Sequence, residues 1–310
     1  MAGPPGRPAG LRAATRGSTL ARVQTSAVAD LLAACCGVDV EAVVVDTVGD
    51  RRTDAPIWAI GGQGVFVKEV QAAVLDGRAD IAVHSAKDLT STPTEGLVIA
   101  AFPPRGDPRD ALVGGTLAGL APGARIGTGS IRRRAQLAWL RPDLTFAGLR
   151  GNMETRLAKA AGFDAIVVAA AALQRLGRSA DWSEVLDPSL VVPQVGQGAL
   201  AVECRDDDVA TRQLLAAIDD RPTRLAVEAE RAFLREVGGS CDLPVGAYAT
   251  VADDGTISLE GLLATGDGRI VIRRRDHDTD PAHLGRRVAR YLLDDAGGAD
   301  LLDVGLPAST

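Results

Sequence analysis

Aromatic residues are scarce in this chain, at 3% of 310 residues. Proteins that bind single-stranded nucleic acids stack the bases on aromatic side chains, so the scarcity argues against that class. Basic residues are not in excess either, because 34 Lys and Arg stand against 40 Asp and Glu, a net charge of −6. A site for anions therefore needs a local cluster of basic side chains, and no nucleic-acid partner is expected.

Cysteine pairs, long apolar runs and targeting signals are missing as well. The four cysteines include no C-x-x-C pair, so their spacing suggests neither a disulfide framework nor a zinc site. No apolar run approaches the ~20 residues that cross a bilayer. The Gly/Pro-rich first ten residues lack the apolar segment of a secretory signal. We expect a cytoplasmic protein without a membrane segment or a metal site.

The pattern of apolar runs predicts three domains. Over 10–103, short apolar runs alternate with amphipathic stretches, as in a parallel sheet covered by helices on both faces. A Pro-rich break starts a second α/β set over 104–198, and the apolar run 199–204 predicts a strand that returns to the first domain, which then also includes 199–222. Two crossings between the same domains indicate a hinged pair with a cleft.

The third domain, 223–310, has no helix between its strands, so it is a small α+β domain with a three-stranded antiparallel sheet joined by Gly-containing hairpin turns. Its expected strands are 246–251, 257–263 and 269–274, and its expected helices are 225–236 and 282–293. In the α/β domains the expected strands are 43–46, 80–84, 97–102, 124–127, 144–149, 165–169 and 199–204, and the expected helices are 66–75, 131–140 and 153–161.

Two strand-to-helix turns carry candidate anion-binding groups. In the first, Thr128 and Ser130 lie in a Gly-rich turn that opens a helix, whose first N–H groups attract anions. Arg132 and Arg133 follow in its first turn, where the helix dipole disfavours cations, so we interpret them as functional. The alternative is a solvated basic helix face.

The second turn, 149–156, carries Arg150 and Arg156 at the end of another expected strand. Guanidinium groups bind carboxylates through paired hydrogen bonds, so these arginines suit a substrate with several carboxylates. Both turns follow the carboxyl ends of strands, where open α/β sheets place ligands. The alternative is that either turn is purely structural.

In the first domain, His84, Lys87 and Asp88 directly follow an apolar strand, and Arg16 and Ser18 form a further candidate anion contact near the N-terminus. Asp88 is the candidate catalytic carboxylate. The alternative is that Lys87 and Asp88 only pair with each other. We expect His84 to be a hydrogen-bonded histidine of the core.

Cys241 lies between two glycines and a proline, so we expect it to be accessible and reactive. The other cysteines, Cys35, Cys36 and Cys204, are expected to be small buried hydrophobic residues. The Gly-rich segment 61–64 lacks the G-x-G-x-x-G spacing, so we interpret it as a mobile loop rather than a nucleotide motif.

Taken in order, eight segments resemble the porphobilinogen deaminase family, from about Leu11 to the last expected helix. No single segment is specific, but eight in the right order are. They are 14–18, 61–69, 82–88, 107–111, 127–133, 149–152, 195–199 and 240–246.

The resemblance implies two periplasmic-binding-protein-like (type II), doubly wound α/β domains plus the small third domain. It implies a monomeric transferase that condenses four porphobilinogen units into linear hydroxymethylbilane for haem biosynthesis, with release of ammonia. It further implies a dipyrromethane cofactor on a thioether to Cys241, with Asp88 as the catalytic aspartate. The implied cofactor-binding residues are Lys87, Thr128, Ser130, Arg132 and Arg133, and the implied substrate-binding residues are Arg16, Ser18, Arg150, Arg156 and Arg175.

The chemistry agrees with this implication. Each pyrrole unit carries an acetate and a propionate, so a growing chain accumulates negative charge that arginines compensate. Loss of ammonia leaves a cationic azafulvene, and a fixed carboxylate near the pyrrole N–H stabilises that charge. The same carboxylate is suited to moving protons at the ring carbon where the new bond forms.

The chain departs from the usual family pattern at Thr19, Gln63, Gly129 and Ser240, where Pro, Lys, Ser and Gly are usual, and Leu89-Thr90 replaces Val-Pro. Gln63 removes an anion contact, and Ser240 stiffens the cysteine turn. Two other functions stay open: a non-enzymatic anion receptor of the periplasmic-binding type, which needs neither Cys241 nor Asp88, and a degenerate relative with impaired elongation.

Overall fold

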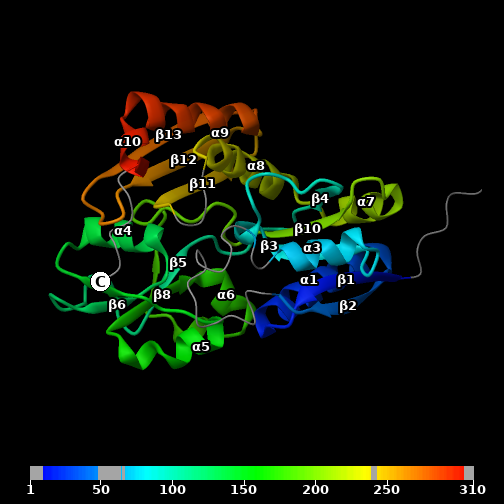
Figure 1. The fold of residues 1–310 in the computed structure, drawn as a ribbon, viewed down its shortest axis with the longest axis horizontal. Helices are drawn as coiled ribbons and strands as arrows, with labels where there is room; N and C mark the ends of the chain where they lie inside the picture. The colour runs from blue at the N-terminus through cyan, green and yellow to red at the C-terminus, as the bar shows by residue number, and fades with distance from the viewer. Residues whose placement is uncertain (1–9, 48–63, 65–66, 239–242, 304–310) are drawn as a thin grey trace, which may run out of the picture. The chain divides into compact units, whose positions relative to one another are not determined.

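The computed structural model describes residues 10–47, 64, 67–238 and 243–303. The chain forms two compact units, Met1–Arg105 with Ala199–Arg224 and Gly106–Gly198 with Leu225–Thr310. Each unit has sheets of its own (Figure 1).

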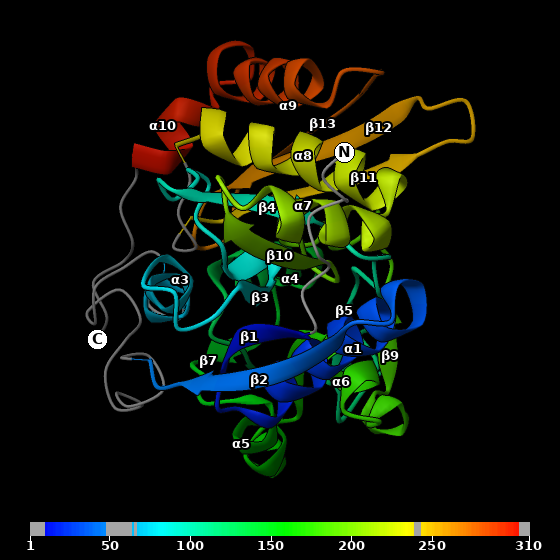
Figure 2. The same cartoon turned by 90° about the vertical axis from the view of Figure 1, so that its right-hand side faces the viewer.

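The first unit is built on a five-stranded sheet with the order β2-β1-β3-β10-β4. Side chains alternate along a strand, so β1 and β3 present apolar residues to both faces. Helices α1 and α3 lie on opposite faces of the sheet (Figure 2). Val28 and Leu32 of α1 belong to the core on one face, and Val70 and Val74 of α3 belong to the core on the other. The elements are β1 (Gly10–Arg16), α1 (Thr19–Cys36), β2 (Asp39–Val45), α3 (Lys68–Leu75), β3 (Ile81–Ser85), β4 (Leu97–Ala101), β10 (Leu200–Arg205) and α7 (Val209–Leu215).

This sheet is mixed, whereas the sequence predicted a parallel one. β1 pairs in parallel with β2 and β3, but β10 runs antiparallel to β3 and β4. β10 is the strand that was predicted to return to the first domain, and its place in this sheet is confirmed. No βα crossover connects it to its neighbours, so the local pattern does not set its direction.

The five-stranded sheet of the second unit has the order β7-β6-β8-β5-β9. It repeats the topology of the first sheet. In each, the first three strands in this order are parallel neighbours, and the fourth position is taken by a strand antiparallel to both of its neighbours, β10 in the first sheet and β5 in the second. The elements are β5 (Asp110–Val113), β6 (Arg125–Gly127), α4 (Ile131–Leu140), β7 (Thr145–Ala147), α5 (Met153–Ala158), β8 (Ala165–Ala169), α6 (Ala170–Arg175) and β9 (Glu184–Leu186).

The second unit also contains the predicted three-stranded antiparallel sheet, in the order β11-β12-β13. Helices α8 and α9 cover one face of this sheet (Figure 1). Phe233 of α8 and Val288 of α9 pack over Gly261 on β12, where a Cβ would collide with both side chains. Leu262 of β12 belongs to a separate core cluster with Ala135 of α4, which joins the two sheets of this unit. The elements are α8 (Arg221–Glu236), β11 (Val245–Val251), β12 (Ile257–Ala264), β13 (Val271–Asp278), α9 (Pro281–Arg290), a π-helical segment (Tyr291–Asp295) and α10 (Gly298–Asp303).

The predicted fold class, two α/β sheets and a small antiparallel sheet, is confirmed, and most predicted elements are present with ends shifted by a few residues. The predicted helix 131–140 and strand 165–169 have the observed bounds. The predicted helix 153–161 ends early, at Ala158. The last predicted strand, 269–274, is shifted to Val271–Asp278, because residues 265–270 form the hairpin turn.

Candidate active site

In the first unit, the candidate residues lie at one edge of the sheet. β1 and β3 are parallel neighbours, so their carboxyl ends meet at the same edge. Arg16 ends β1, and Lys87 and Asp88 lie in a 3-10 turn directly after β3. Ser18 caps α1 by accepting a hydrogen bond from the N–H of Ala21 at 3.3 Å. The fold therefore gathers these four candidates from separate parts of the sequence.

His84 is a core residue, as predicted, with 6% of its surface exposed. Its Nε2 lies 3.1 Å from Oε2 of the buried Glu203, but the two groups are not aligned for a hydrogen bond. The same Oε2 accepts a hydrogen bond from Gln71 at 2.8 Å. The predicted hydrogen bond of His84 is thus replaced by a contact with a buried carboxylate.

In the second unit, the turn between β6 and α4 is built as the sequence indicated. Ser130 caps α4 by accepting a hydrogen bond from the N–H of Arg133 at 3.4 Å, and Thr128 Oγ1 accepts one from the N–H of Ser130 at 3.2 Å. At Gly129 a Cβ would lie 2.9 Å from the carbonyl oxygen of Leu149. The departure from Ser at this position therefore matches a close approach of the neighbouring loop.

Arg132 and Arg133 are buried, with 3% and 5% of their surfaces exposed, so the alternative of a solvated basic helix face is wrong for both. Their shared partner is Asp110, the first residue of β5, which is fully buried. Arg132 donates to Asp110 at 2.7 Å, and Arg133 donates to it at 3.0 and 2.8 Å. Gln197 donates to the same carboxylate at 2.9 Å. We call these residues, Asp110, Arg132, Arg133 and Gln197, the arginine cluster.

The arginine cluster is not neutral. Two guanidinium groups share one carboxylate, and no second carboxylate hydrogen-bonds either of them in the part of the chain that the structure describes. Burial would raise the pKa of Asp110, but the charges of Arg132 and Arg133 outweigh it and hold that pKa well below its usual range. Burial lowers the pKa of Arg132, and the charge of Arg133 lowers it further against the opposite effect of Asp110.

One polar atom of the arginine cluster is left over. The Nε of Arg132 is buried and has no hydrogen-bond partner among the described residues. Buried donors without partners are rare because their desolvation is not repaid. A net positive charge and an unused donor together are the features expected of a site that receives an anion.

The remaining substrate candidates lie in the loop and the helices that follow β7 and β8 of the second unit. Arg150 is exposed and precedes α5, which is capped by Asn152. Arg156 donates from its Nε to the carbonyl of Gly151 at 2.8 Å. Arg175, at the end of α6, donates to the carbonyl of Gly198 at 2.7 Å, and burial lowers its pKa. Their assignment to substrate stays a prediction.

Cys241 lies outside the described residues, as do Gln63 and Ser240. Cys36 and Cys204 are buried as predicted, and burial raises the pKa of Cys204 to about 11. The prediction is wrong for Cys35, which is exposed. Neighbouring positions of a helix point about 100° apart, so only one of two adjacent cysteines faces the core.

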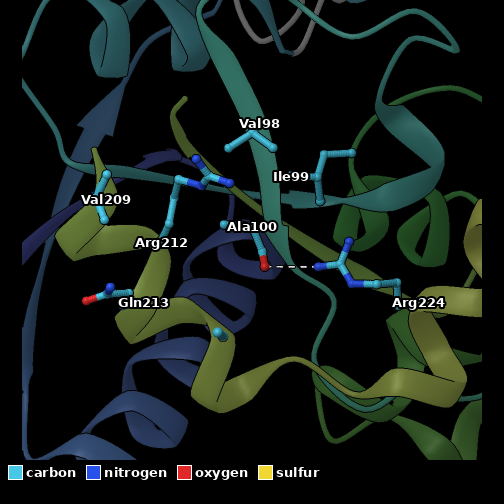
Figure 3. A pocket seen from close by; sticks show the side chains of 8 residues that line it. Val98, Ile99, Ala100, Val209, Arg212, Gln213 and Arg224 are labelled. Carbon is cyan, nitrogen blue, oxygen red and sulfur yellow. Dashed lines mark hydrogen bonds between the residues drawn. The ribbon is translucent and has the colours of Figure 1, made fainter. Parts of the chain in front are cut away.

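The first unit has a surface hollow of about 500 Å³ over β4 and α7 (Figure 3). Arg224 lies at its rim, but its guanidinium is held by the carbonyl of Ala100 at 2.9 Å and by Asp219 at 2.6 Å. None of the predicted site residues lines this hollow. It is therefore separate from the candidate site. The described residues include no cluster of potential metal ligands and no helix long and apolar enough to cross a membrane.

Two family models match the chain. The model described as "Porphobilinogen deaminase, dipyromethane cofactor binding domain" matches residues 11–213, and "Porphobilinogen deaminase, C-terminal domain" matches residues 224–294. The chain belongs to the porphobilinogen deaminase family. It is 49% identical to a porphobilinogen deaminase of Roseiflexus sp., over 92% of this chain and 96% of the relative. A porphobilinogen deaminase of Acidothermus cellulolyticus is 48% identical, over 94% and 90%.

Membership of the porphobilinogen deaminase family makes the chain a transferase of tetrapyrrole biosynthesis, and it does not support the alternative of a non-enzymatic anion receptor. Among solved structures, the methionine-binding protein MetQ is similar over 70% of this chain and 93% of its own, with 12% identity and a TM-score of 0.44. That likeness is too distant to bear on function.

The sequence did not single out Asp110 or Gln197 as site residues, although both lie in segments that carry the family resemblance. One local signal was available, since Asp110 is a charged residue directly before the apolar run Ala111–Val113. A carboxylate at the start of a buried strand needs a cationic partner.

Proposed function

We propose that this chain is a hydroxymethylbilane synthase. It joins four porphobilinogen units, releases ammonia at each coupling, and yields linear hydroxymethylbilane. The observation that carries the proposal is the arginine cluster, a buried site with two cations, one anion and an unused donor on Arg132. A pyrrole chain that bears an acetate and a propionate on each unit supplies the missing negative charge.

The proposal includes a dipyrromethane cofactor on a thioether to Cys241. The donor set fits this group, because carboxylates pair with guanidinium groups and with hydroxyl and N–H donors at a helix start. The residues proposed to hold it are Lys87, Thr128, Ser130, Arg132 and Arg133. When bound, the cofactor supplies an anchored primer to which the new pyrrole units are added.

Asp88 is the proposed catalytic residue. Its carboxylate faces the pyrrole N–H of the reacting unit and stabilises the positive charge that develops as ammonia leaves, without reorganisation of solvent. The same carboxylate moves the proton at the ring carbon that forms the new bond. Arg16, Ser18, Arg150, Arg156 and Arg175 are proposed to bind the substrate carboxylates, and each is a cation or a hydroxyl donor.

We further propose a monomeric, cytoplasmic enzyme with no nucleic-acid or membrane partner. The net charge of −6 supports the absence of a nucleic-acid partner, because a general field of that sign repels polyanionic polymers. We also propose a division into three domains, based on the pattern of apolar runs and Pro-rich breaks in the sequence. The domains are 10–103 with 199–222, 104–198, and 223–310, and the third carries Cys241.

Intact-mass spectrometry followed by incubation with porphobilinogen tests the proposed function. We expect purified protein heavier than its sequence by one dipyrromethane, and formation of hydroxymethylbilane on incubation. Absence of any adduct together with no turnover would refute the proposal. An adduct without tetrapyrrole product would instead identify the degenerate relative with impaired elongation.

A further inference from the structure

Glu230 of α8 is a fully buried carboxylate that the proposed reaction does not use. Its Oε2 accepts a hydrogen bond from the N–H of Gly196 at 2.7 Å, and its Oε1 accepts one from the N–H of Ala249 at 2.9 Å. Two backbone donors thus converge on the two oxygens of one side chain. A carboxylate meets this demand, whereas an amide offers only one acceptor and adds a donor.

Gly196 belongs to a buried segment, Val191–Gly198, which we call the strap. Near its start, Val192 donates to Gln136 Oε1 at 2.7 Å and accepts from Arg132 at 2.7 Å. Near its end, Gln197 donates to Asp110 at 2.9 Å. Both ends of the strap are therefore fastened to the arginine cluster or to its helix, α4.

The middle of the strap is fastened to the small antiparallel sheet. The carbonyl of Pro193 accepts a hydrogen bond from Ala247 of β11 at 3.1 Å. Gly246 allows this approach, because a Cβ there would lie 3.1 Å from the carbonyl oxygens of Val192 and Pro193. Glu230 supplies the second fastening, and it links the strap to β11 and α8 at once.

α8 and β11 are the two elements that flank Cys241 in the sequence, since α8 ends at Glu236 and β11 begins at Val245. We propose that Glu230 is a positioning residue, which acts through the strap to hold the elements on either side of Cys241 in a fixed relation to the arginine cluster. This inference rests on the proposed function, in which Cys241 carries the group whose carboxylates the cluster receives.

A purely structural role for Glu230 makes a different prediction. If the carboxylate only stabilises the fold, its loss lowers the unfolding midpoint and leaves each folded, adduct-bearing molecule fully active. If Glu230 positions the site, folded and loaded molecules also turn over slowly. A displacement of about 1 Å at a reacting centre lowers a rate by up to roughly 100-fold.

The test compares Glu230→Gln and Glu230→Ala with Glu236→Gln, a matched control on the same helix that is partly exposed and pairs with Arg290 at 2.7 Å. Gln136→Met is a second route to the same effect, because it removes both hydrogen bonds between Gln136 and Val192 without touching Glu230, and only Arg132 of α4 then still holds Val192. For each variant we measure the unfolding midpoint by thermal unfolding and the adduct occupancy by intact mass. At a temperature well below that midpoint, we then measure kcat and KM per adduct-bearing molecule and amide hydrogen exchange over 191–198 and 245–251.

We expect faster exchange across the strap in Glu230→Gln, Glu230→Ala and Gln136→Met, with kcat reduced roughly 10- to 100-fold per loaded molecule and KM changed less. The kcat of Glu230→Ala falls further than that of Glu230→Gln, and the kcat of Glu236→Gln matches that of the wild type. The inference is overturned if folded Glu230→Gln or Gln136→Met keeps the wild-type kcat and the wild-type rate of hydrogen exchange in the strap. If wild-type protein carries no adduct and consumes no porphobilinogen, the proposed function has failed, and the exchange data alone still decide whether Glu230 holds the strap.

Discussion

At the scale of single residues, Asp110 is the only carboxylate that compensates two buried guanidinium groups in the described part of the second unit. Removal of one partner from a buried ion pair leaves an uncompensated charge and costs about 3–5 kcal/mol. We therefore expect Asp110→Asn to lower the free energy of unfolding of its unit by about 3 kcal/mol or more, measured by urea denaturation. Asp143→Asn, which removes the exposed partner of Arg141, is the control and should change little. Equal effects of the two substitutions would contradict the account of the cluster.

The depressed pKa of Asp110 also predicts how stability depends on pH. A carboxyl group with a folded-state pKa below its unfolded value of about 3.9 contributes stability above that value. The contribution falls as the pH drops toward the folded-state pKa. The difference in stability between wild type and Asp110→Asn should therefore be constant above about pH 5 and shrink below about pH 4. If the stability difference between wild type and Asp110→Asn instead grows as the pH falls, the pKa of Asp110 is not lowered in the folded state.

Asp88 is the residue on which the proposed chemistry depends. We expect Asp88→Ala to keep the fold, because Asp88 lies in a partly exposed turn, and to lower turnover by about 10²–10⁴-fold. Ammonia release from porphobilinogen measures turnover, and circular dichroism checks the fold. The surface variant Asp76→Ala serves as the control. Near-normal turnover in Asp88→Ala would remove Asp88 from the mechanism.

At the scale of elements, the β12–β13 hairpin docks on α4 through Gly268. Its φ is +75°, and a Cβ there would collide with the carbonyl oxygen of Ala135. Gly255, in the β11–β12 hairpin, has a φ of +84° and open space around it. Gly255→Ala should cost about 1 kcal/mol from backbone strain alone, and Gly268→Ala clearly more, because α4 or the hairpin must move. Thermal unfolding of both variants measures the difference, and equal midpoints would mean that the hairpin does not dock as described.

At the scale of the whole molecule, the proposed thioether changes the mass of the chain. Cys241→Ser should yield protein with the mass of its sequence alone and without turnover, because serine offers no thiolate for the covalent bond. Cys35→Ser, at the exposed cysteine of α1, should keep both the adduct and the activity. A normal adduct on Cys241→Ser would move the attachment to another residue.

Some residues of the candidate site could be predicted from the local sequence, and others could not. Thr128, Ser130 and Asp88 were found from the sequence because each directly follows an apolar strand, and strand ends are visible in the pattern. The role of Arg132 and Arg133 as partners of Asp110 was not visible, because Asp110 is 22 and 23 residues away in the sequence. Glu230 gave no signal either, since its partners lie 34 and 19 residues away.

The sequence by itself determined the α/β class, the order of those elements that it predicted and the position of candidate groups at strand ends, because hydrophobic periodicity and turn residues are properties of neighbouring positions. It did not predict β1, α1 or β5. The tertiary structure alone decided the antiparallel direction of β10 and β5, the burial of the two arginines and the course of the strap. These depend on contacts between distant segments, where the energy of burying a charge or an N–H is set by a partner that no local pattern specifies.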